Sequence, residues 1–250
     1  MRRLPILFPI LFFLGIFPLQ AQAAEPDPPD LTGKWLKEWT LTSTYRIARI
    51  ARFTTTATTY LLVDIDQDGA RLTMETEVCA LVMTNSAPGF QPIVPDAFIE
   101  SLPQADRRAT LTRNGTSWQI TSPAVWNIQG VTLDDPGRDP MPDDPNDPRV
   151  VDQESDGHPG FTIEIEGPFG GSLFLARRSW DSFTGRIYPD SIRGSVQWGA
   201  DEVVLDATRR ILRNSPETTP DPDRSSFLMI PIAPHTTCQH LPDDPSRLFP

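Results

Sequence analysis

Apolar and polar side chains alternate with a period of two along most of this chain, in runs that turn residues separate. The pattern is clearest around DQDG at 66–69, where alternating runs at 53–65 and 71–80 flank the turn signal. Such alternation places successive side chains on opposite faces of a strand. One apolar and one polar face is typical of an antiparallel sheet. The chain is therefore expected to pair strands in hairpins.

The same pattern recurs in short segments along the rest of the sequence. Strands are predicted at 33–41, 109–120 (a hairpin with Asn114-Gly115 as a type I′ turn), 161–167, 172–180, 185–198, 202–208 and 227–232, with turns at 181–185 and 198–201. Helical periodicity is confined to short segments at 92–108 and 207–214. Regularly spaced short strands predict an all-β fold, either an antiparallel meander barrel or a β-sandwich.

The first 23 residues have the organisation of a signal peptide. Arg2 and Arg3 precede an apolar segment at 4–19, and Ala21-Gln22-Ala23 is a small-x-small cleavage motif. Three prolines interrupt the apolar segment, which is shorter than the roughly 20 residues of a membrane span. We expect cleavage near Ala23 and a secreted or periplasmic protein whose mature chain has no membrane span.

Charge excludes one class of partner. Removing the leader's two arginines takes the formal net charge from −11 to −13. A chain this acidic repels phosphate backbones, so nucleic-acid binding is not expected.

The chain has two cysteines, Cys79 and Cys238. An isolated pair in an oxidising compartment is usually a disulfide. We therefore predict a bond that ties the C-terminal tail to an early strand.

The mature length suits one domain. Residues 24–30, AEPDPPD, form a Pro-rich acidic leader that we expect to be disordered, and 31–250 are assigned to a single β-barrel domain. Within it, 133–149 carry five prolines and six aspartates. Proline prevents regular strand pairing, so this segment is predicted to be a long, exposed, partly disordered loop.

Residues 31–35, LTGKW, resemble the Gly-x-Trp signature with which lipocalins and their calycin relatives open their barrels. Gly33-Lys34-Trp35 carries the resemblance, and the family's Thr-Asp-Tyr signature is missing. The resemblance implies a cup with a ligand cavity, in which Trp35 closes one end. It also implies a late arginine packed over that ring, either Arg209 or Arg210.

The apolar strand faces supply candidates for the lining of such a cavity. They are Trp35, Trp39, Leu72, Met74, Phe161 and Trp198. Lys37 lies on the same strand face as Trp35 and Trp39. A barrel of this size can also be filled solid, so a hollow and a filled interior both stay open. A hollow one would hold a small apolar ligand or an envelope component.

DQESDG at 152–157 has the acid spacing of a calcium loop. Such a loop needs oxygen ligands at positions 1, 3, 5 and 7, glycine at 6 and a bidentate acid at 12. The first five demands are met by Asp152, Glu154, Asp156, Gly157 and the backbone carbonyl of His158. Position 12 is an isoleucine, so any calcium site would be weak. The alternative is a polar turn held by Asx-type hydrogen bonds.

Catalytic motifs are scarce: the sequence has no G-x-S-x-G elbow, no H-E-x-x-H and no phosphate-binding glycine loop. The favoured prediction is an exported non-enzymatic barrel that acts as a binding or envelope-associated module, with a weak calcium loop. The alternatives are a secreted enzyme of unrecognised class with a polar site at the barrel mouth, and a purely structural surface protein.

Overall fold

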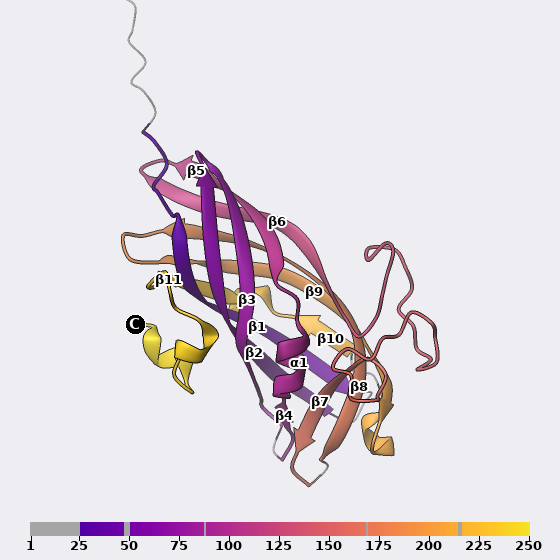
Figure 1. Ribbon diagram of the computed structural model, residues 1–250. Coiled ribbons are helices and arrows are strands. Elements are labelled where there is room, and N and C mark those ends of the chain that lie inside the picture. The colour runs from indigo at the N-terminus through magenta and orange to yellow at the C-terminus, as the bar shows by residue number, and fades with distance from the viewer. Residues whose placement is uncertain (1–25, 48–50, 88, 169, 215–216) are drawn as a thin grey trace, which may run out of the picture.

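The computed structural model describes residues 26–47, 51–87, 89–168, 170–214 and 217–250 (Figure 1). The predicted signal peptide lies outside these residues. In the leader, residues 26–32 have no regular secondary structure before the first strand. The Gln67 side chain donates to the Pro29 carbonyl (3.0 Å) and accepts from the Leu31 amide (2.8 Å). The end of the leader is therefore tied to the barrel.

Strands are the main secondary structure of the described chain. They are β1 (Gly33–Ile47), β2 (Ala51–Asp68), β3 (Arg71–Asn85), β4 (Gln91–Ile93), β5 (Ala105–Asn114), β6 (Ser117–Gln129), β7 (Phe161–Glu166), β8 (Gly171–Ile187), β9 (Ile192–Ala207), β10 (Glu217–Pro220) and β11 (Ser226–Pro231). The helical segments are α1 (Asp96–Ser101) and the 3₁₀ turns η1 (Arg210–Leu212), η2 (Pro222–Arg224), η3 (Cys238–His240) and η4 (Pro245–Leu248). None of these helices has the length and hydropathy of a membrane span.

Eight of the strands close into a ring in the order β1-β2-β3-β5-β6-β8-β9-β11, and β11 pairs with β1. All neighbours are antiparallel and follow one another along the chain, apart from the short insertions. The eight strands are not spaced evenly around a central axis. β7 continues the sheet from β8 and carries β4 at its edge, while β10 pairs with the end of β1. The prediction of an all-β antiparallel meander is confirmed.

Three predicted turns are wrong. Residues 181–185 and 198–201 lie inside β8 and β9, where Asp181 pairs with Trp198, and the two strands turn instead between 187 and 192. In the β5–β6 hairpin, Asn114 pairs with Ser117, so the residues at the turn are 115 and 116.

Two apolar clusters fill opposite ends of the ring. One gathers the start of β1, the β2–β3 hairpin and the end of β8, and contains Trp35, Leu72, Met74, Ile120, Phe183 and Phe227. The other lies beside α1 and β7, and contains Phe98, Phe161, Ile163, Leu175, Val204 and Leu212. The packing of these clusters closes the barrel at one end and narrows it at the other.

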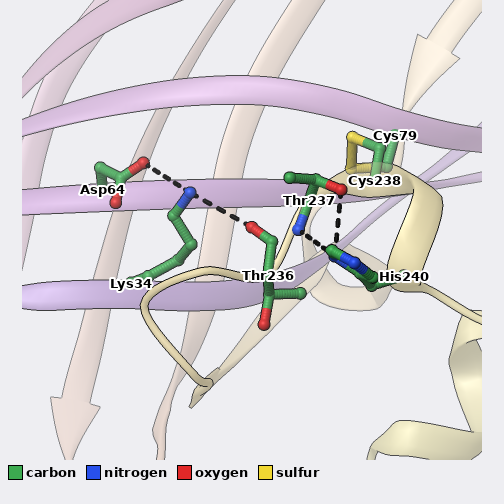
Figure 2. The surroundings of a disulfide bond; sticks show 7 residues. All are labelled: Lys34, Asp64, Cys79, Thr236, Thr237, Cys238 and His240. Carbon is green, nitrogen blue, oxygen red and sulfur yellow. Dashed lines mark hydrogen bonds and ion pairs between the residues drawn. A yellow bond between two sulfur atoms is a disulfide. The ribbon is translucent and has the colours of Figure 1, made fainter.

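The C-terminal tail packs on the outside of β1, β2 and β3. Cys79 sits at a register shift, because Tyr60 pairs with Ala80 while Leu61 pairs with Val78. It forms a disulfide with Cys238 in η3, which confirms the sequence prediction (Figure 2).

Polar and aromatic contacts extend this attachment on both sides of the disulfide. Lys34 contacts Asp64 (3.2 Å) and the Thr236 carbonyl (3.3 Å), as Figure 2 shows. Near the chain end, the Phe249 ring lies 6.2 Å from that of Tyr60. The tail is therefore held along its length against the outer face.

The Pro/Asp-rich segment at 133–149 covers the outside of β8 and β9. Most of its residues are exposed, yet Leu133 and Met141 pack on a small buried cluster with Ala176 and Leu205. Arg178 donates to the carbonyls of Pro136 and Asp139. The segment is thus largely exposed and is fixed to the sheet at these points, and its partial disorder stays a prediction.

Candidate binding site

A cavity of about 380 Å³ lies inside the ring. Its lining comes from β1, β2 and β3 on one side and from β6, β8 and β9 on the other, with contributions from β5, α1, β4 and β7. Cavities that hold small molecules in proteins typically measure about 300–1,000 Å³. Trp126 (44% exposed) and Ile211 (60% exposed) belong to the lining and mark where it meets solvent.

Most of the lining is apolar. Representative side chains are Leu61, Val78, Met83, Phe98, Phe161 and Leu175. An apolar wall with a few polar groups is the usual composition of a small-molecule site. The interior of this barrel is therefore hollow at the level of these residues.

The six side chains proposed from the sequence fall into two groups. Trp39, Phe161 and Trp198 line the cavity. Trp35, Leu72 and Met74 are not part of the lining and lie in the packed cluster at the closed end, to which Trp39 and Trp198 also belong. Alternation alone does not distinguish side chains that line the cavity from side chains that are buried only in the core.

The packing of a late arginine over Trp35, which the resemblance implied, is not observed for Arg209 or Arg210. Its indole N–H donates to the Leu31 carbonyl (2.9 Å). Arg209 and Arg210 are exposed beyond the far end of β9, where Arg209 reaches the Pro168 carbonyl. The structure does not bring either arginine onto the Trp35 ring.

Lys37 is the unexpected member of the lining. Only 3% of it is exposed, and its ammonium lies over three aromatic rings, those of Trp39 (3.8 Å to the centroid), Phe183 (4.4 Å) and Phe227 (5.3 Å). In the described part of the chain, the Lys37 ammonium forms neither a hydrogen bond nor an ion pair. Burial and then repulsion from Arg107 hold the pKa of Lys37 well below its usual value. Attraction to Asp181 acts in the opposite direction.

A buried ion pair stands beside it. Arg107 from β5 binds Asp181 from β8, and their side chains are 11% and 13% exposed. The amide of Asn127 donates to the other Asp181 oxygen (3.0 Å). The Arg107 guanidinium also faces the rings of Trp39 (5.6 Å) and Phe183 (5.3 Å). Two cations therefore share one aromatic surface with a single carboxylate.

A second polar row crosses the same wall. Gln129, Arg177 and Glu202 are direct neighbours on β6, β8 and β9, and all three line the cavity. Gln129 Oε1 and Arg177 Nε are buried without a hydrogen-bond partner among the described residues.

Two acidic groups at this level hold their protons more strongly than usual. Burial raises the pKa of Glu202, and Arg177 opposes the shift. Burial and then Glu202 raise the pKa of Tyr45 to about 12. The charged side chains on β8 and β9 thus face β2 and β3, whose part of the lining is uncharged and mixes apolar side chains with threonines and Asn85.

The candidate calcium loop has its carboxylates turned toward its own backbone. Asp152 accepts from the amides of Asp156 (3.0 Å) and Gly157 (2.8 Å), and Asp156 accepts from the amide of His158 (2.8 Å). Glu154 accepts from the Thr162 amide. Across the described ranges, no group of three or more His, Cys, Asp or Glu side chains is arranged to hold a metal ion. This geometry matches the Asx-type turn, and calcium binding stays a hypothesis.

Sequence reasoning missed most of the polar wall. The sequence did offer one signal for it, because Lys37 lies on an apolar strand face where a cation is unusual. Asp181 was assigned to a turn, and Arg107 to a connection before the next strand. Their inward direction follows only once β5, β8 and β9 are known to run through those positions.

Compared with known proteins, the chain matches no family model, no curated protein and no solved structure. Function is therefore inferred from the cavity and the groups that line it.

Proposed function

We propose that the mature chain is an exported, secreted or periplasmic, non-enzymatic binding protein that holds a small apolar ligand inside its barrel. The cavity of about 380 Å³ carries this proposal, because it reaches solvent and is lined mainly by apolar side chains. Burying an apolar ligand there contributes roughly 25 cal/mol per Å² of surface removed from water. The Cys79–Cys238 disulfide supports an oxidising compartment.

A secreted enzyme is the second reading from the sequence, and the polar wall is where its site would lie. Two carboxylates lie there: Arg107 and Asn127 both bind Asp181, and Glu202 is the cross-strand neighbour of Arg177. A general acid or base needs a pKa near the working pH and access to the reacting proton. These contacts favour a structural part for Asp181, and binding is the simpler role for the cavity.

Filling the cavity tests the proposal. We expect Val78→Trp to weaken binding of an uncharged fluorescent probe, N-phenyl-1-naphthylamine, at least about tenfold, since Val78 lines the cavity. Val82→Trp is the matched control, because Val82 lies on the same strand and is 50% exposed. Fluorescence titration measures both, with circular dichroism to confirm folding. Equal binding by the two variants would contradict the proposal, as would a wild-type protein that binds no probe.

A further inference from the structure

We propose that the ligand is an amphiphilic carboxylate, whose single negative charge sits against Lys37 at the inner end of the cavity while its apolar part lies along β2 and β3. This inference rests on the proposed binding function and names the chemical class of its ligand.

The first support is the lack of a counter-ion for Lys37. A buried charge is normally paired and hydrogen-bonded, because leaving water without a partner is costly. The three rings around Nζ attract a cation but carry no net charge to neutralise it. The amine nevertheless lies in the cavity wall and not in a sealed core. A group arriving through the cavity can therefore reach it.

The second support is the charge balance at this end of the barrel. On the strands that flank β1, Leu61 and Met229 pair with Lys37, and neither ionises. The charged groups that act on it are Arg107 from β5 and Asp181 from β8. With Lys37 protonated, two positive charges face one negative charge.

The charged groups farther along the wall supply no counter-ion for Lys37. Arg177 and Glu202 are cross-strand neighbours on β8 and β9, and burial raises the pKa of Glu202, so this row carries no excess of negative charge. One added carboxylate therefore neutralises the inner end.

The third support is the contrast between the two walls. Beyond Lys37, β2 and β3 place no charged side chain in the lining, and their apolar members include Leu61, Val78, Leu81 and Met83, among threonines. Phe98 and Phe161 line the far end. An aliphatic chain that extends from the head group meets these side chains. The polar row on β6, β8 and β9 faces it from the other side.

Binding of this kind is linked to protons. An anion beside Nζ favours the charged amine, so the ligand should raise the pKa of Lys37 and cause proton uptake. Lys34 and Lys37 are the only lysines of the chain. NMR of lysine labelled at Cε and Nζ therefore reports Lys37 directly against a single other lysine signal.

The experiment compares dodecanoate with 1-dodecanol, which share a chain and differ in charge. We expect wild-type protein to prefer dodecanoate at least about tenfold in isothermal titration calorimetry, and Lys37→Met to lose this preference while it still binds dodecanol. Lys34→Met removes the same charge from the same strand, but from an ion pair with Asp64 outside the barrel, and should keep the preference. In the NMR titration, the Lys37 signals should shift to a higher pKa with dodecanoate only.

The outcomes separate the two proposals. If wild type binds dodecanol and the uncharged probe but does not prefer dodecanoate, the carboxylate assignment is wrong and the binding function stands. The assignment is also wrong if Lys37→Met keeps the preference, or if the Lys37 pKa does not move. If wild type binds none of the three molecules, the binding function itself fails.

Discussion

At the scale of single residues, Lys37 makes the stability of the folded protein depend on pH. Its pKa is lowered on folding, chiefly by burial, from an ordinary value of 10.5. Between the lowered value and 10.5, the unfolded chain holds a proton that the folded chain has released. Stability is therefore gained as pH rises through this window and lost as pH falls through the folded pKa.

Replacing Lys37 removes this dependence. We expect Lys37→Met to be more stable than wild type at pH 6, by about 1–4 kcal/mol as for other buried charges replaced by apolar residues. The advantage should shrink toward pH 10. Urea unfolding at pH 6, 8 and 10 measures it, with Lys34→Met as the charge-matched control. An advantage that stays constant or grows with pH would show that Lys37 is not buried as a cation.

Asp152 tests the two interpretations of DQESDG. It accepts two backbone amides of its own loop, so Asp152→Ala should destabilise the protein in the presence of EDTA. A loss of about 1 kcal/mol corresponds to a fall in Tm of about 2–4 °C for a domain of this size. A calcium site without such hydrogen bonds predicts an unchanged or higher Tm in EDTA. A rise of wild-type Tm with calcium, up to about 10 mM, would support the calcium hypothesis by linkage.

At the scale of elements, the sequence predicts which segments are strands better than where they end. Period-two alternation is sufficient for the β2–β3 hairpin because one face is apolar and the other is wet. It fails at 181–185 and 198–201, where polar residues and glycine resemble turns.

Each failure has a local cause within β8 and β9. Asp181 is polar because it faces the cavity and binds Arg107. Gly199 is small because a Cβ there would lie 2.6 Å from Trp180 Nε1. A hollow barrel admits polar residues inside its strands, and alternation alone cannot distinguish them from turn residues.

Two glycines in the segment that leads into β7 allow two effects on stability to be measured separately. One is the strain of a positive φ, and the other is steric contact of an added Cβ. Gly157 and Gly160 have φ of +86° and +87°, which strains any other residue. A Cβ on Gly157 would meet open space, whereas one on Gly160 would lie 2.1 Å from the Leu175 carbonyl oxygen. We expect Gly160→Ala to cost about 1–3 kcal/mol more than Gly157→Ala, as overpacking does. Urea unfolding of both variants decides, and equal costs would mean that the segment does not pack on β8 as described.

At the scale of the whole molecule, two parts of the outer surface of the ring are covered by other segments of the chain. The C-terminal tail lies on β1, β2 and β3, and the Pro/Asp-rich segment lies on β8 and β9. Leu36 and Leu62, which face outward, are consequently buried. Apolar residues on both faces of these strands explain how a barrel with a hollow centre buries enough surface to be stable.

The disulfide should therefore support the barrel without forming part of the site. It closes a loop of 159 residues, and the chain-entropy model gives a contribution of about 5 kcal/mol for a loop of this length. We expect the Cys79→Ala/Cys238→Ala double variant to lose stability of this order in urea unfolding, and its tail to exchange amide hydrogens faster. Neither cysteine lines the cavity, so the Kd for the uncharged probe should stay within about twofold of wild type. A large loss of probe binding in the folded variant would instead show that tail attachment holds the cavity open.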